Sequence, residues 1–252
     1  MRRSVVNRSG LEHGNGGDVT MSLSWIQGQE LVRDVRPILE KHDAAALVRH
    51  LERYWPADRL VALLGCGDAD AEKTALVCLA LTGSMAHGSR VVRVLHSSDP
   101  AAVGFAEYAL WSIWMRAGDD EANASLHAAV QLIGEECFEL AVERLTELIA
   151  RCPRFAEAYN QRAIALFLQG EYAQAAEDCT RTLRFNPYHF GALAGLGHCH
   201  AAQGRLEPAL DAYRATLQLH PQLEGIRQSL QQIEQGLHKH ALAEGPWRFD
   251  PS

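Results

Sequence analysis

Lysine is almost missing from this chain: among its 252 residues only Lys41, Lys73 and Lys239 are lysines, and arginine supplies the remaining positive charge. Asp and Glu together number 31 against 24 Lys and Arg, so the formal net charge is −7 at pH 7. Proteins that grip a nucleic acid neutralise its phosphates with many Lys and Arg side chains. The acidic balance therefore disfavours a nucleic-acid partner.

The sequence also lacks a long apolar run, whereas a helix needs about 20 apolar residues to cross a bilayer. Its basic first residues are not followed by the apolar stretch of a secretory signal. We therefore expect a cytoplasmic protein with no membrane partner.

Residues 1–28 are predicted to form a disordered segment, because their Gly-, Asn- and Ser-rich start shows no apolar periodicity. Met21 within this segment is an alternative translation start.

Catalytic and metal-binding motifs are missing as well. The chain has no phosphate-binding glycine loop, no G-x-S-x-G and no H-E-x-x-H, so we predict no catalytic residue, no cofactor and no enzyme activity. Its six cysteines form no C-x-x-C pair, which is typical of small buried thiols in a reducing compartment. The run His198-Cys199-His200 comes nearest to a metal motif. Adjacent helical side chains point about 100° apart, so these three cannot converge on one ion and no metal site is predicted.

What the chain does have is a repeat in its second half. Residues of two kinds recur every 34 positions: Pro153, Pro187 and Pro221, and Ala141, Ala175 and Ala209. The stretch before each proline has the apolar spacing of two amphipathic helices, which the proline ends. A fixed period of this length with one helix pair per unit predicts a stacked helical array.

The register holds for three units, 122–155, 156–189 and 190–223. Small residues fill the eighth and twentieth positions of each unit, where the two helices of a pair approach most closely: Ala129, Ala163 and Gly197, then Ala141, Ala175 and Ala209. Gly170 and Gly204 fall at the turns within the second and third units. This pattern resembles the tetratricopeptide repeat (TPR). The first unit departs from it, with Ser125 in place of a large aromatic residue and Glu136 in place of the turn glycine.

The region before these units contains two similar stretches, which begin at Arg59 and Arg90. Each reads as a short helix, a turn with an aspartate (Asp68 or Asp99) and a longer apolar helix. The pair resembles HEAT-type repeats, and degenerate TPR units remain an alternative. The polar stretch from Ala117 to Asn123 is the predicted boundary. It is too short for a free linker, so the two regions should stack continuously.

The expected fold is therefore all-α: a right-handed α-solenoid of stacked antiparallel helix pairs. A HEAT-like region over residues 29–120 precedes the TPR-like units over 122–223, and a Gln-rich amphipathic helix over 224–242 caps the last unit. Residues 243–252 form a tail that carries Trp247 and Phe249. The tail either folds back into the groove, docks on another copy or leans on the capping helix.

The TPR resemblance implies that the first helix of each unit lines a concave groove for a peptide or helix. The groove positions carried over to this sequence are Leu126, Val130, Glu157, Asn160, Ile164, Phe167, Leu168, Gly191, Ala194, Gly195, His198, Ala201 and Ala202. Asn160 and His198 are the polar anchors of an otherwise apolar set. A glycine inside a helix costs about 1 kcal/mol relative to alanine. Gly191 and Gly195 therefore indicate either a surface that a partner's backbone approaches or close packing against a neighbouring helix.

The resemblance implies a non-catalytic adaptor that binds a segment of another protein. Some TPR proteins hold a chaperone's terminal carboxylate with Lys, Asn and Arg, but here Asn160 lacks its basic companions and Gly191 and Gly195 appear instead. We therefore reject that clamp. The alternatives are a structural or regulatory subunit that self-associates and, more distantly, an enzyme whose site is assembled across repeats. The alanine- and arginine-rich composition is typical of a bacterium with a GC-rich genome.

Overall fold

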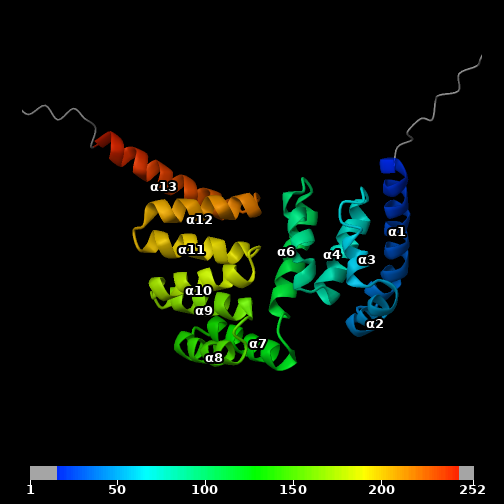
Figure 1. Ribbon diagram of the computed structural model, residues 1–252, viewed down its shortest axis with the longest axis horizontal. Coiled ribbons are helices and arrows are strands. Elements are labelled where there is room, and N and C mark those ends of the chain that lie inside the picture. The colour runs from blue at the N-terminus through cyan, green and yellow to red at the C-terminus, as the bar shows by residue number, and fades with distance from the viewer. Residues whose placement is uncertain (1–15, 244–252) are drawn as a thin grey trace, which may run out of the picture.

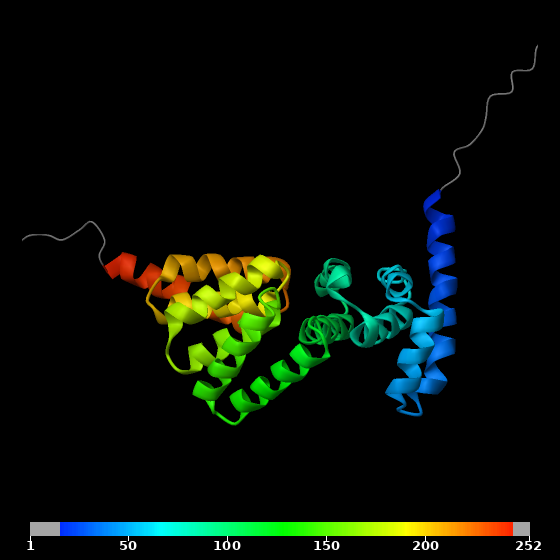
Figure 2. The same cartoon turned by 60° about the horizontal axis from the view of Figure 1, so that its bottom comes forward.

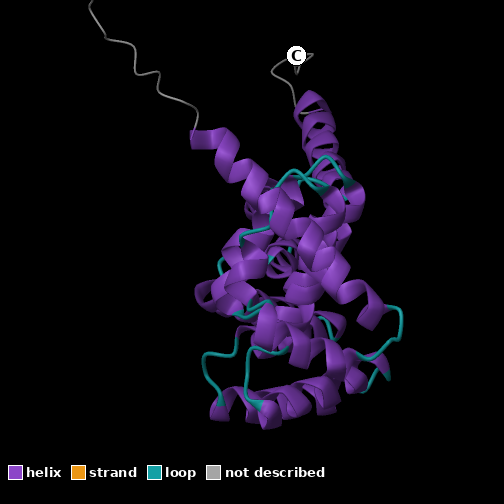
Figure 3. Ribbon diagram, turned by 90° about the vertical axis from the view of Figure 1, so that its right-hand side faces the viewer, coloured by secondary structure: helices purple, strands orange, loops and turns teal. Residues whose placement is uncertain are grey.

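The computed structural model describes the backbone of residues 16–243 and the side chains of residues 23–239. Within this part of the chain every regular element is a helix, and short loops connect the helices (Figure 3). This confirms the predicted all-α solenoid of stacked helix pairs. The tail with Trp247 and Phe249 lies outside the described residues, as do residues 1–15. No helix of residues 16–243 has both the length and the apolar character needed to span a bilayer.

The first region contains six α-helices and two short 3₁₀ helices. They are α1 (Gly16–Leu39), α2 (Ala44–Tyr54), α3 (Ala57–Val61), α4 (Ala69–Thr82), η1 (Met85–His87), α5 (Gly88–Val91), η2 (Val92–His96) and α6 (Pro100–Met115). Helix α1 begins well before the predicted end of disorder at residue 28. It packs closely on α4 at Gly28, where an added Cβ would lie 2.6 Å from Cβ of Ala71.

The two similar stretches around Asp68 and Asp99 fold alike. Asp68 accepts hydrogen bonds from the backbone N–H groups of Asp70 and Ala71, and Asp99 accepts one from Ala101. Each aspartate is thus the N-cap of a long apolar helix, α4 or α6. The two helices pack against each other in the main core. The likeness of this region to HEAT repeats stays a prediction.

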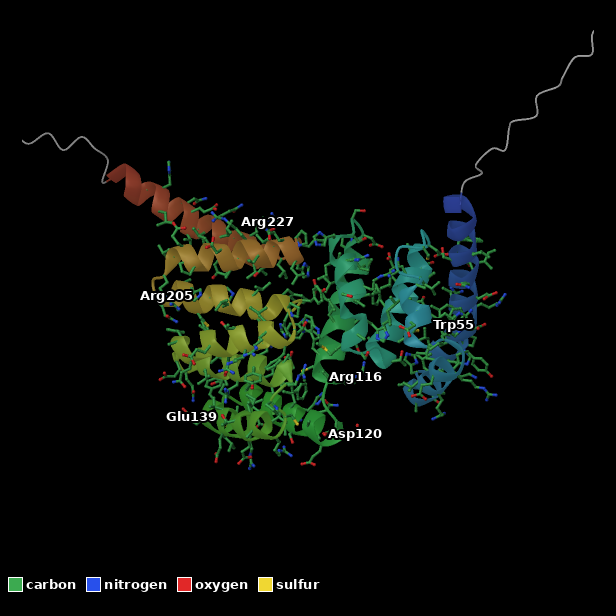
Figure 4. The ribbon with its side chains drawn as sticks, viewed as in Figure 1. Trp55, Arg116, Asp120, Glu139, Arg205 and Arg227 are labelled. Atoms are coloured by element: carbon green, nitrogen blue, oxygen red, sulfur yellow. The ribbon has the colours of Figure 1, made fainter. Side chains whose placement is uncertain are left out.

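Trp55 anchors the first helices to one another (Figure 4). Its side chain is buried, and its indole N–H donates to the carboxylate of Asp34 on α1 at 3.2 Å. The guanidinium of Arg59 on α3 lies 3.6 Å from the centre of its ring. A cation over an indole face is attracted by the ring quadrupole, so one side chain joins α1 to α3.

Three helix pairs follow the 34-residue register. They are α7 (Asp120–Gly134) with α8 (Phe138–Arg151), α9 (Ala156–Leu168) with α10 (Tyr172–Phe185), and α11 (Phe190–Ala202) with α12 (Leu206–Leu219). The six small residues of the repeat lie where the helices cross. The five alanines are at most 4% exposed, and Gly197 is also buried. Gly197 shows why: an added Cβ would lie 2.4 Å from the ring of Tyr213.

The turns within the pairs require a left-handed residue. Gly170 and Gly204 take φ values of +84° and +71° at two of these turns. At the third turn Glu136 takes φ of +59°. A residue with a Cβ is strained in this conformation, so the first unit keeps the turn geometry of the repeat without its glycine.

Helix α13 (Glu224–Ala243) covers the last pair. Ile226 is buried against Tyr213 of α12, and Leu230 and Ile233 are partly buried in the same cluster. Its Gln-rich face is exposed, as a cap on an apolar flank requires. Figures 1 and 2 place α1 and α13 at opposite ends of the molecule.

Helix α6 joins the two regions (Figure 1). Trp111 and Trp114 on α6 contact the rings of His189 and Phe190, at the point where α11 begins. Phe190 belongs to the same buried cluster as the first region's core. Arg116 lies at the C-terminus of α6 (Figure 4). Its guanidinium donates a hydrogen bond to the carbonyl of Ala80 on α4. The TPR-like units therefore pack sideways on α6 as well as on one another.

A second link lies nearer the N-terminus of α6, at Glu107. Nε2 of His220, at the end of α12, lies 2.6 Å from a carboxylate oxygen of Glu107. The His220 ring is fully buried and meets Phe190 edge to face. Two residues later Gln222 donates its amide N–H to the carbonyl of Ser97 at 2.8 Å. The closing turn of the third unit is thus held against the first region.

Candidate functional site

A cavity of about 310 Å³ lies between α9 and α11, with α10 behind it and α6 beside the start of α11. Most of its wall is apolar, and its lining contains no Asp, Glu, Lys or Arg. The lining residues are Trp111, Asn160, Ala163, Ile164, Phe167, Leu168, Cys179, Gly191, Ala194, Gly195, His198 and Cys199. At its rim Ile164 and Leu168 are 39% and 51% exposed. A concave apolar surface that continues into exposed aliphatic side chains is typical of a binding site.

Asn160 is held in place by a buried network behind the cavity. Its side-chain N–H donates to a carboxylate oxygen of Glu157 at 2.9 Å, and the amide of Gln161 donates to the same oxygen at 2.7 Å. The other oxygen of Glu157 faces Nε2 of His189 at 2.8 Å. Glu157 and His189 are both buried. The carboxyl group thus fixes which way the amide of Asn160 points.

The hydrogen bonds also fix the tautomer of His189. The backbone N–H of Ala192 donates to Nδ1 of His189 at 3.0 Å, so Nδ1 carries no proton and Nε2 donates to Glu157. His189 thereby acts as the N-cap of α11 while it binds α9. One side chain aligns the two helices that form the cavity.

His198 supplies the second polar group of the lining. Its Nδ1 lies 2.8 Å from the hydroxyl of Tyr213 on α12, and its ring faces that of Phe167 with centroids 6.4 Å apart. Burial lowers the pKa of His198 below its ordinary value of 6.5. The imidazole is therefore neutral at pH 7 and leaves the cavity uncharged.

Two thiols form part of the wall. Cys179 and Cys199 are buried and hydrogen-bonded to each other. This bond, together with burial, raises the pKa of Cys179, and the same bond lowers the pKa of Cys199. Polarizable sulfur atoms favour aromatic neighbours.

Gly191 and Gly195, the two glycines of α11 at predicted groove positions, are both packed closely. A Cβ on Gly191 would lie 2.9 Å from the ring of Trp111, and one on Gly195 would lie 3.2 Å from Sγ of Cys179. At Gly191 this agrees with the second alternative, in which the glycine allows close packing against a neighbouring helix. Both glycines also line the cavity, where they leave backbone accessible.

Eight of the predicted groove residues line the cavity: Asn160, Ile164, Phe167, Leu168, Gly191, Ala194, Gly195 and His198. Leu126 is buried between α7 and α8, and Glu157 is buried behind Asn160. Val130 is half-buried on α7, and Ala201 packs toward α12 and α13. Ala202 is exposed at the end of α11. The structure thus brings the second and third units together around one cavity.

Sequence reasoning missed four lining residues, namely Trp111, Ala163, Cys179 and Cys199. Ala163 and Cys199 occupy repeat positions at which small buried residues are expected, so the repeat pattern predicts that they belong to the core. Trp111 lies before the repeats, on a helix assigned to the other region. Its one signal is the presence of a second tryptophan three residues later, on the same face of α6.

The described residues contain no group of three or more His, Cys, Asp or Glu side chains placed to hold a metal ion. His198 contacts Tyr213, and Cys199 contacts Cys179 on another helix. His200 lies 2.7 Å from the guanidinium of Arg205, so the three adjacent side chains 198–200 contact different neighbours.

The comparison with known families bears on the same helices. The tetratricopeptide repeat model matches residues 156–189, which form α9 and α10. The chain contains a TPR domain. The matched unit supplies Asn160, Phe167 and Leu168 to the cavity.

Two curated relatives share the repeat. A TPR repeat-containing protein of Rhizobium etli is 32% identical over 108 residues, which is 43% of this chain and 53% of the relative. The small glutamine-rich tetratricopeptide repeat-containing protein 2 of Saccharomyces cerevisiae is 37% identical over 82 residues, 32% of this chain and 24% of the relative. The chain thus spans about half of the first relative's length and a quarter of the second's.

Two solved TPR structures are similar in fold. The first TPR domain of Spaghetti (RPAP3), bound to an HSP90 peptide, shares 22% identity with a TM-score of 0.47, over 48% of this chain and 96% of that one. The Sgt2 TPR domain from Aspergillus fumigatus shares 16% identity with a TM-score of 0.48, over 53% of this chain and 89% of that one.

Proposed function

We propose that this chain is a non-catalytic adaptor that captures a segment of another protein in the cavity between α9 and α11. The observation that carries the proposal is the apolar cavity that opens beside the exposed side chains of Ile164 and Leu168. Burying these side chains under a partner would remove apolar surface from water, which is the main driving force of protein association. A TPR domain at the same helices supports a protein partner.

The lining favours an uncharged segment. An acidic tail would lose its hydration in the cavity without meeting a Lys or Arg among the lining residues. This extends the argument against a carboxylate clamp from the sequence to the site. The partner segment should therefore present an apolar side chain at the cavity and keep its charges outside it.

The test compares partner capture by two variants from the source cell. A variant with Asn160, Phe167 and His198 changed to alanine should lose at least about tenfold in recovery of the specific partner, because truncating central anchors removes most binding energy. Leu140→Ala is the matched control, since Leu140 is 40% exposed on α8 and does not line the cavity. Circular dichroism and denaturation must show that both variants fold. Equal recovery by both would contradict the proposal.

A second candidate is a subunit that self-associates through the first region. Exposed side chains of Leu39 and Tyr108 border another cavity of about 240 Å³ between α1, α2, α4 and α6. Analytical ultracentrifugation over a wide concentration range separates the two functions. An adaptor stays monomeric without its partner, whereas a self-associating subunit forms oligomers that Tyr108→Ser disrupts. If the purified chain turned over a substrate, an enzyme function would replace both the adaptor and the self-associating subunit as the proposed function.

A further inference from the structure

We propose that the occupant of the cavity is an aromatic side chain with a hydrogen-bond donor, a tryptophan or tyrosine, on an uncharged segment of the partner protein. This inference rests on the proposed adaptor function and names the chemistry that the cavity recognises. It follows from four properties of the lining: its orientation of Asn160, its rings, its lack of charge and its size.

The first property is the fixed acceptor. Asn160 directs its N–H toward Glu157, and its amide oxygen has no hydrogen-bond partner among the described residues. A flipped amide would set its oxygen against the carboxyl oxygen that Asn160 and Gln161 now share. The amide therefore offers an acceptor to the cavity, which a ligand N–H or O–H satisfies. A ligand without a donor would leave the oxygen desolvated and unpaired.

The second property is the ring-lined wall. Trp111 comes from α6, Phe167 from α9 and His198 from α11, so the aromatic groups approach from three helices. The thiols of Cys179 and Cys199 complete the wall. Aromatic rings favour offset or edge-to-face contact with other rings, and sulfur favours ring edges. This surface suits a planar ring better than an aliphatic side chain.

The third property is the absence of charge. Trp111, Asn160 and His198 carry the polar atoms of the lining besides the thiols, and none is a counterion for a carboxylate or ammonium. Placing a charged side chain there would cost its hydration free energy with no compensating ion pair. Indole and phenol groups bring a donor into the cavity without a charge.

The fourth property is size. A volume of about 310 Å³ lies at the lower end of the range of roughly 300–1,000 Å³ that small-molecule sites span. The cavity thus holds one large side chain rather than a helix. Gly195 and Ala194 border it with little or no side chain, which lets the segment's backbone approach α11.

The test uses capped pentapeptides Gly-Ser-X-Ser-Gly, with X as Trp, Tyr, Phe, Leu or Glu, titrated into the full chain by NMR up to millimolar concentration. The Trp or Tyr peptide should bind about five- to tenfold more tightly than the Phe peptide, which is the effect of one hydrogen bond between neutral groups. The Leu peptide should be weaker still, and the Glu peptide should not bind. In Asn160→Leu the advantage of Trp and Tyr over Phe should disappear.

The outcomes separate the two proposals. If no peptide binds, the adaptor function of this cavity fails. If the Phe and Leu peptides bind as tightly as the Trp and Tyr peptides, the groove function stands and this inference is overturned. A chain that ends at residue 243 is the remaining arm: tighter binding there would identify Trp247 of the chain's own tail as the occupant and overturn the assignment to a partner. Unchanged binding supports the partner.

Discussion

The indole of Trp114 stacks on the imidazole of His189, with ring centroids 4.2 Å apart and planes 22° from parallel. Trp114 comes from the last turns of α6, and His189 begins α11 and binds Glu157 of α9. This one contact therefore links the first region to both helices of the cavity. It makes the placement of Asn160 depend on the junction between the two regions.

Replacing Trp114 tests this coupling. Trp114→Ala should lower the free energy of unfolding by about 3–5 kcal/mol, because it removes a large buried aromatic side chain. Chemical denaturation followed by circular dichroism measures the loss. Trp25→Ala is the control, since Trp25 is 50% exposed and should change stability by less than about 0.5 kcal/mol. A loss at Trp114 no larger than at Trp25 would contradict the role of the stack.

The carboxyl group of Glu157 should be irreplaceable by an amide. In Glu157→Gln the new N–H group would face a donor from Asn160, Gln161 or His189. One buried donor then loses its acceptor, which should cost about 1–3 kcal/mol of folding free energy. Glu177→Gln, an exposed change on α10, should cost almost nothing. Equal stability of the two variants in urea would show that the network contributes little.

Glu136 is a place where the chain can be stabilised. Glu136→Gly removes the strain of a left-handed side-chain residue at φ of +59°, so the variant should gain about 0.5–1 kcal/mol after the entropy of the unfolded glycine is subtracted. The neighbouring Glu135 has φ of −89°, and Glu135→Gly should lose stability instead. Thermal unfolding of both variants gives the comparison, and a loss in both would argue against strain at Glu136.

Gly195 is expected to matter for binding more than for folding. In Gly195→Leu the new side chain begins 3.2 Å from Sγ of Cys179 and extends into the cavity wall. Peptide affinity should fall by at least about tenfold, since the cavity is small. The melting temperature should change little, because a helix-favouring leucine offsets the close contact. Gly104→Leu on α6 is the control, with open space around its Cβ. Unfolding of the Gly195 variant would mean that this glycine is structural.

His198 predicts a pH dependence. Its pKa in the folded protein lies below the ordinary 6.5, so the unfolded chain binds the proton more readily. The contribution of neutral His198 is therefore complete above about pH 6.5 and is lost as the pH falls toward the folded pKa. Its neighbours include the hydroxyl of Tyr213 and the ring of Phe167, and the thiols of Cys179 and Cys199 line the same cavity. When the pH falls from 7.5 to 5.5, the free energy of unfolding should decrease less in His198→Gln than in the wild type. In the control variant His127→Gln it should decrease as much as in the wild type.

The sequence was a good guide to local structure. The spacing of Ala141, Ala175 and Ala209 reflects helix crossings that only a small residue permits, so the period predicts the helix pairs. The aspartates predicted at the turns, Asp68 and Asp99, cap α4 and α6, because capping depends only on a few neighbouring residues. The contact of Gly28 on α1 with Ala71 on α4 joins two separate helices, so no local pattern around Gly28 predicts it.

The 34-residue repeat pattern does not predict contacts between residues that are far apart in the sequence. Trp111 shows no period, yet its ring fills the space that Gly191 leaves open beside the cavity. Glu157 occupies a groove position by register, but its partner His189 turns it away from solvent. His220 reads as a polar residue in a turn, and its contact with Glu107 lies 113 residues away. Each depends on how α6 packs, which no repeat position specifies.

The contact of His220 with Glu107 also sets the length of the array. In an open solenoid each repeat contacts only the repeats next to it, so duplication or deletion of one repeat leaves the other contacts unchanged. Here a deleted unit would leave Glu107 without its imidazole, and an inserted one would carry His220 past the end of α6. A change in the number of repeats would therefore break a contact in this chain that an open solenoid does not have.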